Sequence, residues 1–93
     1  MSAVHNDFEQ LRVFAERLQG YLDTIDDANA NLDNAFAELG EIWTDQKRTE
    51  FEEVYEQLCQ TMMVFKENAS QQIPYLCELA NILEEYYNRR ASL

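Results

Sequence analysis

Two long runs of residues with a seven-residue apolar period dominate this sequence. The seam positions of the first run, which alternate steps of three and four residues, are Phe8, Leu11, Ala15, Leu18, Leu22, Ile25, Asn29, Leu32, Phe36 and Leu39. Those of the second run are Phe51, Tyr55, Leu58, Met62, Phe65, Ala69, Gln72, Leu76, Leu79, Leu83 and Tyr86. This spacing places side chains along one stripe of an α-helix. The sequence therefore predicts two long helices, each with an apolar stripe that needs a partner.

The ends of the helices follow from the residues between the two runs. Gly40 comes directly after the last apolar position of the first run, where a glycine in the left-handed conformation commonly closes a helix. Thr44 or Asp45 caps the second helix, and Asp45 also places a negative charge near the positive end of the helix dipole. We expect a single helical domain over 1–93, with a helix over about 7–39, a turn over 40–44 and a helix over about 45–90.

Pro74 lies inside the second run and requires a distortion of the helix. A proline there clashes with the carbonyl of Ser70 and removes one hydrogen bond. The seven-residue phase continues through Pro74, which favours a kink near 70–74 over a reversal of the chain. With a kink, the fold class is an all-α, long antiparallel helical hairpin. With a reversal, the last segment folds back and the chain is a three-helix monomer.

The predicted pairing of the two helices leaves part of the second one uncovered. Folding the arms together about residue 42 places Phe8 opposite Leu76, so the second helix continues for about 14 more residues, or about 20 Å. A second hairpin packed antiparallel would cover this overhang, which predicts a dimeric four-helix bundle. The same pairing brings Asn29 near Tyr55, and we expect the amide to bond the tyrosine hydroxyl inside the seam.

The charge of the chain excludes several classes of partner. The net charge is -11, from 18 acidic and 7 basic residues, so phosphate backbones and anionic membranes are repelled and no nucleic-acid ligand is expected. No apolar run approaches the roughly 20 residues of a membrane span, and the first residues lack the features of a signal peptide. We expect no membrane insertion and a cytoplasmic location.

Residues that could carry chemistry are few and scattered. The only histidine, His5, precedes the predicted first helix, so no Cys/His or Ser/His/Asp arrangement is available. Cys59 and Cys77 lie 18 residues apart without neighbouring ligands, which argues against a zinc site. The aspartates lack the central glycine of a calcium loop. We expect no enzyme activity, no metal and no cofactor. Seam positions explain Met62 and Tyr86 as core residues, which leaves Met63 and Tyr87 as candidates for contacts outside the hairpin.

The turn motif Trp43-x-Asp45, with Phe51 eight residues after the tryptophan, resembles that of the WXG100 family of small helical-hairpin proteins. The resemblance extends from Phe8 to Tyr87. It implies that Trp43 is the motif tryptophan, that Asp45 replaces the motif glycine and that Phe51 is a core aromatic. Members dimerise as antiparallel hairpins, and many are substrates or partners of type VII secretion. The family's C-terminal export signal, Tyr-x-x-x-Asp/Glu, is absent here, although export without a signal peptide stays open.

The resemblance predicts a non-enzymatic interaction module: a WXG100-like substrate, adaptor or small chaperone of a type VII-like secretion system. The expected partners are a second copy or a similar hairpin, and beyond these a secretion component or a client helix. The candidate partner surface consists of Trp43, Leu79, Leu83, Tyr86 and Tyr87. Trp43 has a second interpretation, as a plug that closes the end of the hairpin. The alternative function is an acidic antagonist of the immunity type, whose carboxylates occupy a basic site on a target.

Overall fold

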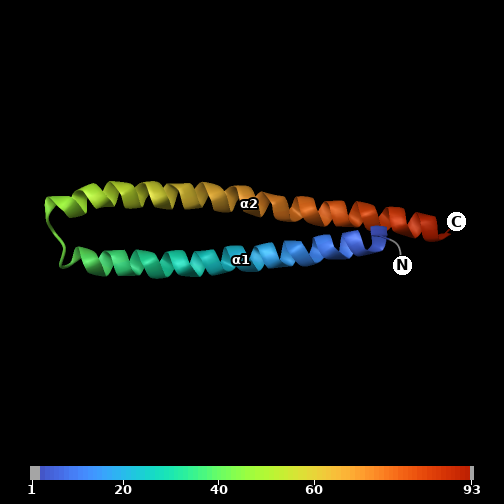
Figure 1. The fold of residues 1–93 in the computed structure, drawn as a ribbon, viewed down its shortest axis with the longest axis horizontal. Coiled ribbons are helices and arrows are strands. Elements are labelled where there is room, and N and C mark those ends of the chain that lie inside the picture. The colour runs from blue at the N-terminus through green and yellow to red at the C-terminus, as the bar shows by residue number, and fades with distance from the viewer. Residues whose placement is uncertain (1–2, 93) are drawn as a thin grey trace.

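The protein is a hairpin of two long helices. The computed structural model describes residues 3–92, and the side chains of 7–91 within them. Helix α1 covers Ala3–Gly40 and helix α2 covers Gln46–Ser92. The two helices run antiparallel and lie side by side (Figure 1), forming a rod of 73 × 17 × 15 Å. The described residues contain no strand, so the predicted all-α helical hairpin is confirmed.

The turn between the helices is held by backbone bonds and by a cap on α2. The amides of Ile42 and Trp43 both donate to the carbonyl of Leu39, at 3.1 and 2.8 Å. At the start of α2, the amide of Arg48 donates to the Asp45 carboxylate at 3.2 Å. The same amide also donates to the Asp45 carbonyl at 3.1 Å. Asp45 is therefore the N-cap of α2, because its side chain accepts a hydrogen bond from an amide in the first turn of the helix.

Gly40 is the last residue of α1, but its role differs from the predicted one. No glycine in the described part of the chain has a positive φ, so the left-handed closure predicted for Gly40 is wrong. A Cβ atom at Gly40 would instead overlap the guanidinium group of Arg48. That guanidinium lies 5.7 Å from the centre of the Phe36 ring. The absence of a side chain at Gly40 thus makes room for Arg48 to lie over the aromatic ring.

Helix α2 continues without interruption through Pro74. Its 47 residues include the proline, and Figure 1 shows a gentle bend towards α1 and no reversal of direction. The three-helix monomer is therefore not adopted. Helix α1 also differs from the prediction, because it begins at Ala3 rather than near residue 7.

The register of the hairpin corrects the predicted overhang. The ring of Phe8 lies 6.2 Å from that of Tyr87, which is 11 residues further along α2 than Leu76. Part of the shift arises because α2 begins only at Gln46, so the fold-back point lies later than residue 42. Helix α1 consequently covers almost the whole of α2, and the long apolar overhang does not exist.

The core of the hairpin is small. Among residues 7–91, the buried apolar side chains are Phe8, Ala15, Leu22 and Ala80. The register places Ala15 opposite Ala80, and these residues are only 3% and 0% exposed. Two alanines at this crossing allow the helix backbones to approach more closely than larger side chains would. The expected pairing about residue 42 would place Ala15 opposite Ala69, so the close approach is shifted along α2 by 11 residues.

Candidate interaction surface

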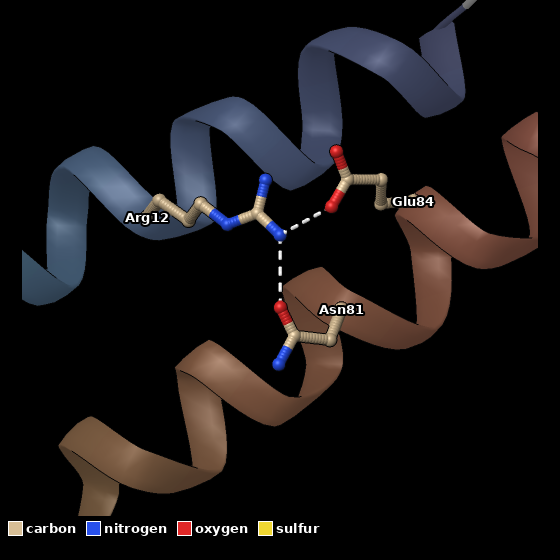
Figure 2. Close-up of polar contacts among 3 residues, drawn as sticks. All are labelled: Arg12, Asn81 and Glu84. Carbon is tan, nitrogen blue, oxygen red and sulfur yellow. Dashed lines mark hydrogen bonds and ion pairs between the residues drawn. The ribbon is translucent and has the colours of Figure 1, made fainter.

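One edge of the seam between α1 and α2 is closed by polar contacts. Arg12 of α1 donates from one nitrogen to Asn81 at 2.8 Å and to Glu84 at 2.7 Å, both on α2 (Figure 2). Further along this edge, Lys66 forms an ion pair with Asp26. These contacts are partly exposed, so each stabilises the hairpin by no more than about 1 kcal/mol. Their main consequence is to fix which sides of the two helices meet.

A third polar contact corrects the predicted role of Asn29. The hydroxyl of Tyr55 donates to the carboxylate of Asp33 instead of pairing with Asn29. This hydrogen bond, together with desolvation and the negative charge of Asp33, raises the pKa of the Tyr55 hydroxyl above its ordinary value of 10.0. Asn29 is half-buried beside Tyr55 and lines the same cavity.

The raised pKa of Tyr55 predicts a delayed ionisation of one tyrosine. The neutral phenol is favoured in the folded chain, so this contribution to stability is complete below pH 10 and is lost as the pH rises through the elevated pKa. In an alkaline titration followed by tyrosinate absorbance, we expect Asp33→Asn to shift the latest ionisation to lower pH. Asp23→Asn, which removes another α1 carboxylate, is the control and leaves the curve unchanged. An Asp33→Asn curve identical to that of the unmodified protein would contradict the assignment.

The opposite edge of the seam is exposed and apolar. Three polar residues of α1 contact α2, and each follows a seam residue by four positions. They are Arg12, Asp26 and Asp33, which follow Phe8, Leu22 and Asn29. Positions on the other side of the α1 and α2 stripes must therefore share the opposite face of the hairpin. The exposed large side chains at these positions, here called the apolar face, are Phe14, Tyr21, Leu32, Leu39, Phe51, Val54, Leu58, Phe65, Tyr75, Ile82 and Tyr86.

The apolar face carries no acidic residue. Between its members, the same side of α1 carries Leu11, Leu18, Ile25, Ala28 and Ala35. On α2 the intervening positions are Thr61, Asn68, Gln72 and Leu79, which are uncharged. Of the 18 acidic residues of the chain, Asp7 alone lies on this side, seven residues before Phe14 and beyond the last member of the face. Segregation of this kind separates one surface suited to apolar contacts from a strongly acidic remainder.

The residues of the turn motif lie together at the closed end of the hairpin. The Trp43 ring is 6.0 Å from Phe51, whose ring is 6.0 Å from Phe36. Phe36 in turn stacks on Tyr55, with 4.4 Å between the ring centres. Trp43 is half-buried in this cluster. The packing accounts for the plug interpretation of Trp43 and leaves its outer surface accessible.

The predicted partner residues of α2 divide between the seam and the apolar face. Tyr87 packs against Phe8 within the hairpin, whereas Tyr86 is exposed, so the interpretation of Tyr86 as a core residue and of Tyr87 as a contact outside the hairpin is wrong. The exposure of Tyr86 agrees with its place on the candidate partner surface. Leu79 and Leu83 are half-buried. The register explains the difference, because α1 reaches far enough along α2 for Phe8 to cover Tyr87. Sequence reasoning missed Phe14 and Val54 as surface residues, although each directly precedes a seam position, Ala15 and Tyr55 respectively.

The described residues offer little basis for other kinds of site. They contain no group of three or more histidine, cysteine, aspartate or glutamate side chains able to hold a metal ion. No helix within 3–92 has the length and apolar character needed to cross a membrane. The sequence matches no protein-family model, no curated protein and no solved structure in the comparisons made. The fold therefore defines the class of the protein as an all-α helical hairpin, with the apolar face as its candidate site.

Proposed function

We propose that this chain is a non-enzymatic interaction module that pairs through its apolar face with a second helical hairpin. The observation that carries the proposal is the long, charge-free apolar face on an otherwise acidic chain. The expected complex is an antiparallel four-helix bundle in which each apolar face covers the other. In this form the protein acts as a WXG100-like substrate, adaptor or small chaperone of a type VII-like secretion system.

The surface area of the hairpin supports a partner. Its accessible surface is 7227 Å², whereas a compact monomer of 11.0 kDa exposes about 5,600 Å². The difference, about 1,600 Å², exceeds the roughly 800 Å² that each partner buries in a standard interface. The apolar face extends along a rod-shaped hairpin, so a second hairpin of similar length has a shape suited to cover it.

The arrangement of the proposed complex gives Trp43 a second role. In an antiparallel pair, the turn of one hairpin lies near the open end of the other, where Leu83 and Tyr86 are found. Trp43 and these two residues of the second hairpin would form a groove at each end of the bundle, suited to an amphipathic helix. A secretion component or a client helix is the occupant that this groove would take.

A pair of valine substitutions on α2 tests the proposal. Val54 lies on the apolar face and is 58% exposed, whereas Val64 lies outside it and is 46% exposed. Val54→Glu places an unpaired charge in the proposed interface and is expected to weaken association about a hundredfold or more. Val64→Glu adds the same charge to the same helix and is expected to leave the mass in sedimentation equilibrium unchanged. Equal masses for both variants and the unmodified protein would contradict the proposal.

The acidic antagonist remains a second candidate because all carboxylates except that of Asp7 lie away from the side of the hairpin that carries the apolar face. They would stay exposed in the proposed complex and could meet a basic target. Binding through carboxylates weakens as salt is added, since exposed charges are screened. Helix pairing through the apolar face is insensitive to salt. Titration of the isolated partner at low and high salt therefore separates the two functions.

A further inference from the structure

A cavity between the helices is lined by three sulfur-containing side chains. It has a volume of about 330 Å³, and its walls include Asn29, Leu32, Tyr55 and Leu58. Cys59, Met62 and Met63 of α2 line the same cavity. The helical seam accounts for Met62, but neither the hairpin core nor the apolar face uses Cys59 or Met63. These two side chains are exposed, and Cys59 is a free thiol.

The spacing of the three residues brings their side chains together on the helix. Met62 and Met63 follow Cys59 by three and four residues, and residues at these separations are neighbours on a helix surface. Cys59 therefore lies between the two methionines rather than beside only one. Since α2 is continuous over Gln46–Ser92, this arrangement is built on a regular helix and not on a loop.

We propose that Cys59, Met62 and Met63 form a three-sulfur binding site for Cu(I). A thiolate and two thioethers are soft ligands, which select cuprous ion over hard cations. On binding, the Cys59 thiol loses its proton as the copper–sulfur bond forms, so one proton is released and the thiolate neutralises the ion's charge. No electron is transferred. Zinc is a poor fit, since its protein sites are formed by cysteine, histidine and carboxylate ligands.

The surroundings of the cavity favour a cation. Asp33 and Glu67 line it, in a chain with a net charge of -11. Lys66 also lines the cavity, but its ammonium group is paired with Asp26. Cys59 lies four residues after the seam position Tyr55, and Met63 lies one residue after the seam position Met62. Both are on the side of α2 away from the apolar face. Leu32 and Leu58 in the cavity wall belong to the apolar face, so the cavity reaches that face, whereas Cys59 and Met63 lie on its other side. The existence of the site does not depend on the proposed function.

Cys77 provides a matched control for the test. It is also a free, exposed thiol on α2, but no methionine lies three or four residues from it. Under anaerobic conditions, the protein would be titrated with Cu(I) against a chromophoric Cu(I) chelator. We expect one tight site in the unmodified protein and in Cys77→Ser, and loss of that site in Cys59→Ser. The double variant Met62→Leu, Met63→Leu is expected to bind at least about tenfold more weakly, because even outer-shell partners change metal affinity by about 10- to 100-fold.

Two measurements decide the outcome. Helical circular dichroism of each variant shows whether the hairpin is intact, and X-ray absorption of the copper-loaded protein reports the ligands directly. Coordination by three sulfur atoms in the unmodified protein supports the site even if a methionine variant unfolds. Equal affinities of Cys59→Ser and Cys77→Ser, or coordination by fewer than three sulfurs, would overturn the proposal.

Discussion

Replacement of Leu22 by alanine is expected to lower the free energy of unfolding by about 2–5 kcal/mol. Leu22 lies near the middle of α1 and is only 4% exposed, in a hairpin whose described core includes few other buried apolar side chains. The substitution removes apolar contacts and leaves a cavity that the straight helices cannot easily close. Because the total stability of a small domain is about 5–15 kcal/mol, the loss is a large fraction of it.

Urea denaturation followed by circular dichroism would measure the effect of Leu22→Ala. Both proteins must be compared at the same concentration, because the stability of an associating chain depends on its concentration. Val13→Ala is the control on the same helix: Val13 is 48% exposed and lies outside the apolar face. Its effect is expected to stay within about 0.5 kcal/mol. Equal effects at Leu22 and Val13 would mean that the described core does not stabilise the fold.

Replacement of Ala80 by leucine is expected to destabilise the hairpin by about 1–3 kcal/mol. Ala80 is fully buried where the register places it opposite Ala15, so the larger side chain must push the helices apart or distort them. The direction is opposite to that expected from hydrophobicity alone, since leucine buries more apolar surface. This substitution therefore tests the close approach of the helices rather than the size of the core.

The control for Ala80→Leu is the same substitution at an exposed alanine. Ala30 lies on α1 one residue after the seam position Asn29 and is exposed. Ala30→Leu is expected to change the free energy of unfolding by no more than about 0.5 kcal/mol. If Ala80→Leu proved neutral or stabilising by the same urea assay, the register of the hairpin would be wrong.

The helices and their connection were predictable because local signals agree with one another. The seven-residue spacing continues on both sides of Pro74, and α2 is continuous there. Asp45 combines a capping side chain with a charge suited to the helix dipole, and it caps α2. Each of these features depends on residues within a few turns of helix, so no knowledge of the partner helix is needed.

The register could not be predicted with the same success, because it depends on how the chain crosses the turn. The numbers of two opposed residues sum to twice the number of the fold-back residue. An error in the fold-back point therefore changes the predicted partner of any residue by twice that error. Phe8 thus lies beside Tyr87 and not Leu76, which removes the overhang and leaves the tyrosine expected to contact a partner half-buried against α1. Gly40 shows the same limit, since its role depends on Arg48 in the next helix.

The sequence pattern alone could not predict the position of the apolar face. A stripe of seam and flanking positions is wider than one partner helix covers, and the pattern does not say which side stays exposed. The contacts of Arg12 with Glu84 and of Asp26 with Lys66 decide the matter, because they place the polar sides of both helices together. The case for a second hairpin therefore depends on the apolar face and not on an overhang.

The solution mass of the unmodified chain tests the central claim most directly. Sedimentation equilibrium across a dilution series would measure it without altering any residue. If the apolar face pairs with a second copy, the mass is twice the 11.0 kDa of the chain and falls only at high dilution. A mass of 11.0 kDa at every concentration would show that the isolated chain leaves its apolar face uncovered, and would contradict self-association.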